Sequence, residues 1–421
     1  FPSIGFLSFW WLLRSQRVPF AALWSLGLLV VSEAFIYRMS MPRVQTLSLA
    51  VLILALHWLM TGRQRWLLPL AFLYVWLYDA FPLILPLAGA YVAAGWLLER
   101  RLRWQPLAYA ALGIALGLLV NPYFPENLVF LHRHILPKLV DSTAISVGSE
   151  WYPYRTTQLI ENSGLALAAF LAGVLGLGLQ KRRMGARTAT LFLLSVLFGF
   201  MLFKSRRFIE YWPPFALLFS AFAWAPILRI WIGEKNSADE PTNANPSGSG
   251  PAREGSSWRR RILAGSLIAA LLPALWFNLQ TSRESVLRSK PIGRYAQASA
   301  WLKDHSPPGS RVFQTDWDDF PRLFFFNSHN TYTLGLDPTY MQLHDSELYL
   351  LWVDISGGRV ELPSQEIRRT FGAEYVLTDL KHRSFLEAAE RDPNLAEVYR
   401  DEHAAVFQVL LPDWGSMERS S

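Results

Sequence analysis

The chain has 421 residues, of which 52% are hydrophobic and only 17% are charged. It contains no cysteine, so disulfides and thiolate metal sites are excluded. The formal net charge of +7 is assigned to arginines that flank apolar segments, and nucleic acid is not an expected partner.

Residues 1–277 carry long apolar stretches, which predict a helical membrane domain. A helix needs roughly 20 apolar residues to span the bilayer. The predicted spans are 18–37, 44–60, 66–78, 82–98, 105–120, 163–180, 187–203, 211–232 and 261–277, preceded by a partial one at 3–13. The chain begins at Phe1 inside an apolar stretch, so we expect a fragment without its true amino terminus. The first expected partner is the lipid bilayer.

Basic clusters recur after every second stretch, and the positive-inside rule places them in the cytoplasm. They are Arg14/Arg17, Arg63/Arg65, Arg100/Arg101/Arg103, Lys181/Arg182/Arg183/Arg187 and Arg259/Arg260/Arg261. This orientation makes 1–232 a transmembrane domain with a long outer loop at 121–162. Residues 233–258, rich in Pro, Gly, Ser and Asn, form a flexible cytoplasmic linker before a last span at 259–279.

Residues 280–421 have the composition of a water-soluble domain, placed outside by the same count of spans. A helix is predicted at 292–305, followed by a turn at SPPGS and a strand at RVFQ. A further strand, EYVLTDL, precedes a helix at 384–391, and AVFQVLL is the last strand. Strands that alternate with helices predict a small exoplasmic α/β domain, so the fold class is a polytopic α-helical membrane domain followed by an α/β domain.

Two basic groups fall on the outer face, where the orientation rule disfavours them. They are Arg38 with Arg43, and Lys204 with Arg206 and Arg207, the last three followed by Glu210 and Tyr211 in SRRFIEYWPPF. Arginine binds phosphate in a bidentate manner, and a charge at membrane depth is costly unless it is paired. The alternative is a cluster whose side chains reach to lipid headgroups.

Three further carboxylates in this part of the chain carry candidate chemistry. Glu33 lies in an apolar run and is either functional or paired with Arg38 or Arg43. Asp79, at the tip of an outer hairpin, is a base, a metal ligand or a helix cap. Glu150 in EWYPY stands beside aromatic residues that stack on sugars or lie in the interface, and the substrate-binding candidates there are Glu150, Trp151 and Tyr152.

In the soluble part, three acids follow the RVFQ strand. Asp316, Asp318 and Asp319 suit a divalent cation, the one cofactor that the sequence suggests, but a solvated turn that caps the next helix is the favoured interpretation. No glycine-rich phosphate-binding fingerprint is present in the sequence.

The helices with short outer hairpins, the long outer loop, the RRFIEYWPP cluster and the exoplasmic tail resemble the C-type glycosyltransferases. TDWDDFP at 315–321 is similar to the Trp-Trp-Asp region of oligosaccharyltransferase catalytic subunits, although only Trp317-Asp318 match. The resemblance implies an enzyme of a plasma membrane, expected to be bacterial. Such an enzyme transfers a hexosyl or pentosyl group from a polyprenyl-phosphate carrier to an acceptor at the outer face.

The resemblance also implies roles for the residues above. Arg206 and Arg207 would hold the lipid phosphate, supported by Lys204, Arg38 and Arg43, while Glu33 and Asp79 are the carboxylates left for catalysis. In the family the catalytic carboxylate usually lies in the first outer loop, which we expect to be missing. The rival is a non-catalytic scaffold or transporter of envelope assembly, although the paired halves of many transporters are not evident.

Overall fold

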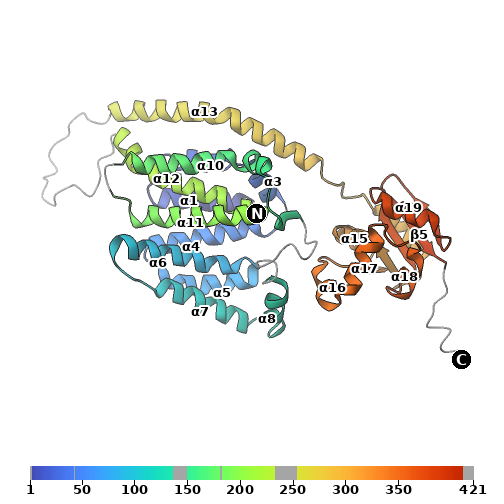
Figure 1. Ribbon diagram of the computed structural model, residues 1–421. Helices are drawn as coiled ribbons and strands as arrows, with labels where there is room; N and C mark the ends of the chain where they lie inside the picture. Colours follow the sequence, from blue (N-terminus) through green and yellow to red (C-terminus); the bar gives the residue numbers. More distant parts are fainter. Residues whose placement is uncertain (1, 42, 136–148, 181–182, 233–253, 411–421) are drawn as a thin grey trace, which may run out of the picture. The chain divides into compact units, whose positions relative to one another are not determined.

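The computed structural model describes residues 2–41, 43–135, 149–180, 183–232 and 254–410 (Figure 1). They belong to two units, Phe1–Phe130 with Ser149–Arg288, and Leu131–Gly148 with Ser289–Ser421. The soluble part was predicted to begin at 280, whereas α13 (Glu254–Leu287) continues past that residue and the second unit resumes at Ser289. Most of the predicted linker lies outside the described residues, but its last residues, 254–258, are helical.

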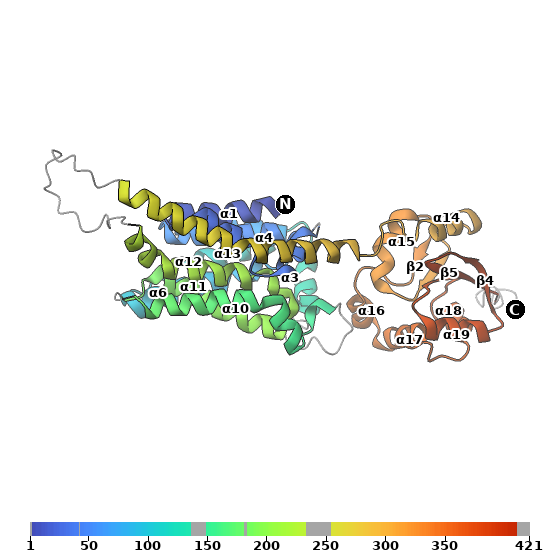
Figure 2. The same ribbon diagram turned by 90° about the horizontal axis from the view of Figure 1, so that it is seen from above.

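The first unit is a bundle of helices that run side by side in both views (Figures 1 and 2). Its elements are α1 (Pro2–Ser15), α2 (Ala21–Gly27), α3 (Glu33–Ser40), α4 (Gln45–Met60), η1 (Gln64–Trp66), α5 (Leu67–Leu77), η2 (Phe81–Leu83), α6 (Ile84–Glu99), α7 (Gln105–Leu119), α8 (Glu126–Phe130), η4 (Ser149–Trp151), α10 (Thr156–Gly178), α11 (Ala186–Lys204), η5 (Arg206–Glu210), α12 (Trp212–Trp231) and α13.

Five helices in the described part are long and apolar enough to cross a membrane. They are Phe81–Glu99, Thr156–Gly178, Ala186–Lys204, Trp212–Trp231 and Arg261–Leu287, and they confirm five of the predicted spans. A sixth is reached if α3 and α4 count as one bent span. Only 6% of the apolar window in α13 is buried, as expected for a helix whose apolar surface faces lipid.

The predicted span at 18–37 is wrong. α2 ends at Gly27, and α3 begins only at Glu33. Ser32 marks the start of α3: its Oγ accepts a hydrogen bond from the Phe35 amide at 3.0 Å and donates one to the Asn162 carbonyl at 2.6 Å. A serine that caps the helix and is tied to α10 fixes where α3 starts, and thereby places Arg38 near the end of α3.

Glycines let α7 approach α5 closely. A Cβ atom at Gly113 would lie 2.3 Å from the Leu68 carbonyl oxygen, and one at Gly117 would lie 2.9 Å from that of Phe72. The four-residue spacing puts both glycines on one face, an arrangement that favours close helix contact in membranes. This contact fixes α5, which ends just before Tyr78.

The second unit is an α/β fold with one five-stranded sheet in the order β2-β1-β3-β5-β4. β1, β2 and β3 are parallel, whereas β5 is antiparallel to both β3 and β4. The elements are α14 (Ala296–His305), β1 (Arg311–Gln314), η6 (Trp317–Asp319), α15 (Phe320–Phe326), β2 (Thr331–Tyr332), α16 (Thr339–His344), α17 (Ser346–Ser356), α18 (Pro363–Arg369), β3 (Tyr375–Asp379), α19 (Arg383–Arg391), β4 (Leu395–Arg400) and β5 (Ala404–Val409). A π-helix, η3 (Leu131–Ile135), belongs to this unit and packs against α16.

Both faces of the sheet are covered by helices. Val312 and Leu377 pack on one face with Leu302 of α14 and Leu323 of α15. On the other face, the rings of Phe385 in α19 and Phe407 in β5 pair at 6.3 Å, and Phe313 of β1 pairs with Phe371. The predicted fold class, a helical membrane domain followed by a small α/β domain, is confirmed.

Candidate functional site

Glu150 is the centre of an ion-pair network at one end of the helical bundle. Its carboxylate accepts hydrogen bonds from Arg38 Nη2 at 2.8 Å and Arg43 Nη1 at 3.1 Å, and pairs with Arg207 Nη1 at 3.5 Å. Burial would raise the pKa of Glu150, but Arg207 and Arg38 outweigh it and hold the pKa below its usual value. Glu150 therefore stays ionised and draws together three arginines, each of which is more than 50 residues from it in sequence.

The second carboxylate, Glu210, lies beneath this network and is fully buried. Its Oε1 accepts a hydrogen bond from Arg38 Nε at 2.6 Å, while Oε2 has no partner among the described residues. Arg38 thus bridges an outer carboxylate, 23% exposed, and an inner one. A buried charge of this kind is tolerated only because its partner is fixed in place.

One backbone and one side-chain hydrogen bond hold the segment around η4 against the start of η5. The Arg206 amide donates to the Tyr152 carbonyl at 3.1 Å, and Ser205 Oγ donates to the Glu150 carbonyl at 3.0 Å. Ser205 also caps η5 by accepting from the Arg207 amide at 3.4 Å. These contacts bring EWYPY and SRRFIE, about 50 residues apart in sequence, into one site.

Aromatic rings hold the two adjacent arginines of η5. The Arg207 guanidinium lies 4.7 Å from the Trp151 ring centroid and donates a hydrogen bond to the Tyr78 hydroxyl. That of Arg206 lies 5.2 Å from the Tyr154 centroid, and its Nε donates to the Pro153 carbonyl at 3.1 Å. The terminal nitrogens of Arg206 have no partner among the described residues, so they are the cationic donors best placed to receive an anion.

The sequence did not single out Tyr78, and Ser205 was noticed only as part of a basic run. Tyr78 precedes Asp79 at the end of an apolar helix, which was the available signal. Its position opposite Arg207 depends on the packing of α5 against its neighbours, so only the structure identifies it.

The two predicted catalytic carboxylates lie in different surroundings. Glu33 accepts a hydrogen bond from Ser285 of α13 at 3.1 Å, so the predicted ion pair of Glu33 with Arg38 or Arg43 is wrong. Asp79 is exposed and has no partner among the described residues. Its predicted role as a helix cap is also wrong, because Ala80 is the N-cap of η2 and no side chain caps that helix. Asp79 directly follows Tyr78, whose hydroxyl accepts a hydrogen bond from Arg207.

Tyr211 and Lys204 were predicted to bind substrate, but neither takes part in the ion-pair contacts of Glu150 described above. Tyr211 is buried, and its hydroxyl forms a hydrogen bond with Ser48 Oγ at 2.8 Å, which in turn contacts the Tyr74 hydroxyl. This polar chain ties α4 and α5 to the start of α12, so Tyr211, like the buried Glu210, supports the site from below. Lys204 is exposed at the end of α11.

The residues in the described part do not fit a divalent cation. No group of three or more His, Asp or Glu side chains there is arranged to hold a metal ion. Asp316 caps η6 through a hydrogen bond from the Asp318 amide at 2.9 Å, and Asp319 accepts from Lys290 Nζ at 3.0 Å and from the Tyr295 hydroxyl. The favoured interpretation of this acidic run, a turn that caps a helix, agrees with these contacts.

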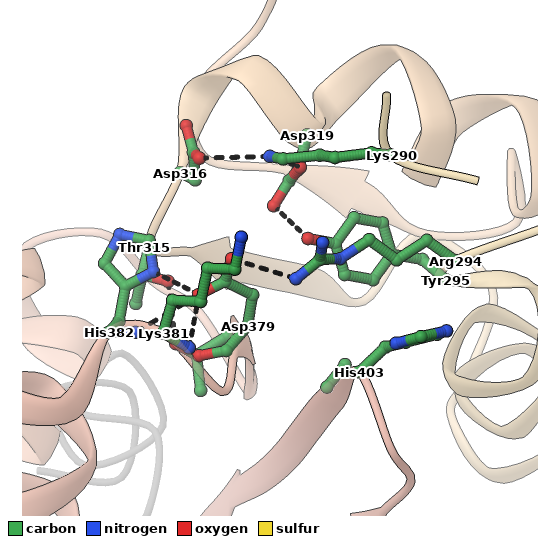
Figure 3. A network of polar contacts seen from close by, with 12 residues as sticks. Lys290, Arg294, Tyr295, Thr315, Asp316, Asp319, Asp379, Lys381, His382 and His403 are labelled. Atoms are coloured by element: carbon green, nitrogen blue, oxygen red, sulfur yellow. Dashed lines mark hydrogen bonds and ion pairs between the residues drawn. The ribbon is translucent and has the colours of Figure 1, made fainter. Parts of the chain in front are cut away.

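A second polar network lies at the carboxyl ends of the parallel strands β1 and β3 (Figure 3). Asp379, the last residue of β3, is buried and accepts a hydrogen bond from His382 Nδ1 at 2.7 Å. Arg294 Nη2 contacts its other oxygen at 3.3 Å, and the Lys381 amide donates to Oδ1 at 2.9 Å. Although burial opposes ionisation, the hydrogen bond and charge of His382 lower the pKa of Asp379 to about 2.

We expect the stability of the second unit to depend on pH through His382. The hydrogen bond with Asp379 raises the pKa of His382 in the folded protein. The protonated imidazole therefore contributes fully to the free energy of unfolding below the pKa of an unfolded histidine, about 6.5, and this contribution is lost as the pH rises through the folded pKa. His382→Gln should therefore destabilise this unit by on the order of 1–2 kcal/mol at pH 5.5 and by much less at pH 9. Pulse proteolysis of the full-length protein measures this difference, and an equal loss at both pH values would contradict it.

The fold is shared with solved structures of the oligosaccharyltransferase of Archaeoglobus fulgidus. The apo crystal structure matches with a TM-score of 0.61 at 13% identity, over 93% of this chain and 60% of that chain. The enzyme tethered to an acceptor peptide that contains the NVT sequon matches with a TM-score of 0.55 at 13% identity. The structure of AglB from the same organism, in complex with an inhibitory peptide and a dolichol-phosphate, matches with a TM-score of 0.56 at 12% identity. Each match covers 93% of this chain and 59% of the other chain. No family model and no curated protein sequence matches.

The chain thus spans about 60% of the length of the structures that it matches. At 12–13% identity the likeness concerns the fold alone, and it agrees with the predicted helical membrane domain followed by an α/β domain.

Proposed function

We propose that this protein is a membrane glycosyltransferase that takes a sugar from a polyprenyl-phosphate carrier. The observation that carries the proposal is the convergence of arginines from α3 and η5 on one end of a bundle with this fold. Five cations, Arg38, Arg43, Lys204, Arg206 and Arg207, belong to the segments of this site, against the three carboxylates of Glu150, Glu210 and Asp79, which leaves an excess of two positive charges. An anion that carries an apolar chain suits a cationic site at the end of membrane helices. The neighbouring archaeal enzyme was solved with such a molecule, a dolichol-phosphate.

In this proposal the arginines bind the phosphate that leaves. Arg206 offers its terminal nitrogens, while Glu150 and Trp151 hold Arg207 in position. Preorganised cations stabilise the charge that develops on the phosphate as its bond to the sugar breaks.

Asp79 is the proposed general base. It removes a proton from the acceptor, the acceptor heteroatom forms a bond with the anomeric carbon, and the carbon–oxygen bond to the phosphate breaks with its electron pair on the phosphate. The transferred group is a hexosyl or pentosyl residue. Because the described residues do not fit a metal, no step of this reaction is assigned to one.

The phosphate role is tested with undecaprenyl phosphate in nanodiscs. Arg206→Ala and Arg207→Ala should each weaken its binding by roughly 1.5–3 kcal/mol, the range for hydrogen bonds to charged groups. Lysine at either position should restore binding only in part, because a point charge does not reproduce the bidentate fork. Arg155→Ala is the matched control, since Arg155 is an exposed arginine that immediately precedes α10. Unchanged affinity in both variants would leave these residues as headgroup anchors and favour the scaffold.

We also propose that the network faces the outside of a bacterial plasma membrane, as the positive-inside rule favours. Two exposed positions are suited to single cysteine replacements in this cysteine-free chain. They are Arg65, between α4 and α5, and Ser346, at the start of α17. An impermeant maleimide added to intact cells should label Ser346→Cys but not Arg65→Cys until the cells are opened. The reverse pattern would invert the orientation, and labelling of both from outside would reject it.

A further inference from the structure

At the other end of the bundle, two large cavities share four lining residues. One, of about 660 Å³, is lined in part by Arg101 and Arg103, and the other, of about 980 Å³, by Arg183 and Arg229. Gln16, Glu99, Ala186 and Arg187 line both. Because α11 runs from Ala186 to Lys204, these cavities lie at the opposite end of that helix from the network around Glu150.

The charge lining the cavities is strongly positive. Five arginines, Arg101, Arg103, Arg183, Arg187 and Arg229, stand against the single carboxylate of Glu99. The Arg229 side chain donates to the Arg17 carbonyl at 2.7 Å, whereas the side chains of the other four have no ion-pair or hydrogen-bond partner among the described residues. The five come from three separate segments, so their convergence is a product of the fold and not of one basic run.

Two further features indicate the kind of ligand, the first of which favours a phosphate. Ala186 and Arg187 form the first turn of α11, and no side chain caps this turn, so its amide groups and the positive end of the helix dipole border the cavities. The side-chain oxygen of Gln16 is buried and has no partner in the described part of the chain. It would accept a hydrogen bond from a hydroxyl of the ligand.

The walls of the larger cavity are apolar where they approach the membrane helices, with Leu179, Phe222, Ile227, Ile230 and Trp231 among them. A ligand that combines a phosphate with acyl chains meets both surfaces at once. We infer that this end of the bundle binds an anionic phospholipid, with the phosphate between Arg101 and Arg187 and the acyl chains against α12. Basic pockets between membrane helices commonly bind such headgroups.

The test measures phospholipid binding and does not depend on transferase activity. Native mass spectrometry of the detergent-solubilised protein is titrated with phosphatidylglycerol, with phosphatidylcholine as the uncharged comparison. Arg187→Gln and Arg101→Gln should each weaken phosphatidylglycerol binding about fivefold, which corresponds to ~1 kcal/mol, and the double variant should weaken it more. Arg65→Gln, an exposed arginine outside both cavities, should bind as wild type does.

Three outcomes would overturn the inference. Equal losses in Arg65→Gln and Arg187→Gln would show general attraction to a basic surface. If the wild-type protein bound phosphatidylcholine as tightly as phosphatidylglycerol, the apolar wall alone would account for lipid binding. Displacement of phosphatidylglycerol by millimolar inorganic phosphate, with the same dependence on Arg187, would assign the site to a free anion. Equal thermal midpoints for all variants without added phospholipid would exclude misfolding as the cause of a loss.

Discussion

Replacement of Arg38 by alanine should lower the free energy of unfolding of the helical bundle by about 3–5 kcal/mol, the cost of leaving one partner of a buried ion pair unpaired. The side chain of Arg38 is 12% exposed and that of Glu210 is fully buried, so solvent does not take over the lost contact. The measurement is unfolding in mixed micelles, read by circular dichroism. Arg43→Ala is the control, because Arg43 is half exposed and contacts only the outer carboxylate; it should cost less than about 1 kcal/mol.

A double variant separates the ion pair from a general effect of truncation. Replacement of Arg38 by Met together with Glu210 by Leu removes both charges and keeps apolar volume, which often restores stability at buried pairs. The double variant should therefore be more stable than Arg38→Ala alone. If Arg38→Ala and Arg43→Ala prove equally stable, the buried pair does not hold the bundle end together, and the network must be stabilised elsewhere.

Asp79→Asn should reduce sugar transfer by roughly 10²–10⁴-fold, the usual contribution of a general base. Asparagine keeps the size of the side chain but does not accept the proton. The variant should fold normally, because Asp79 is exposed and has no partner among the described residues. Proteoliposomes are prepared with a membrane lipid extract of the producing cells, which supplies the polyprenyl-linked sugars. Transfer is then measured by mass spectrometry as the loss of these lipid-linked sugars.

Glu33→Gln is the matched comparison for Asp79. Glutamine still accepts the hydrogen bond that Ser285 donates to Glu33, so folding and transfer should stay near those of wild type. Wild-type activity in Asp79→Asn would remove Asp79 from the mechanism. Loss of activity in Glu33→Gln alone would transfer the role of base to Glu33, while the phosphate-binding proposal, which is measured separately, would stand or fall by its own test.

The sequence alone was enough to predict the class of the fold. Hydrophobic runs longer than about 18 residues, flanked by arginines, are a local signal of a membrane helix, and five of the predicted spans are present. The alternation of strands and helices after residue 290 predicted the α/β unit for the same reason, since each element buries a face whose period is visible in the sequence. The unusual cations Arg38, Arg206 and Arg207 were also found from sequence, because the orientation rule concerns charge and position only.

Only the tertiary structure decided which charges meet. From sequence, Glu33 was the nearest partner for Arg38, but Glu33 and Arg38 lie near opposite ends of α3, and Arg38 pairs with Glu150 and Glu210. Ion pairs depend on distances between segments that lie more than 100 residues apart, and no local pattern encodes such distances. The break at Ser32 has the same origin: the run from 18 to 37 is apolar enough to be one helix, but the hydrogen bond of Ser32 to the Asn162 carbonyl stabilises a new helix start. The sequence therefore determined the helices and strands and the candidate charged residues. The packing of α3, η4 and η5 determined the site, because contacts between distant segments decide which of several locally possible ion pairs is formed.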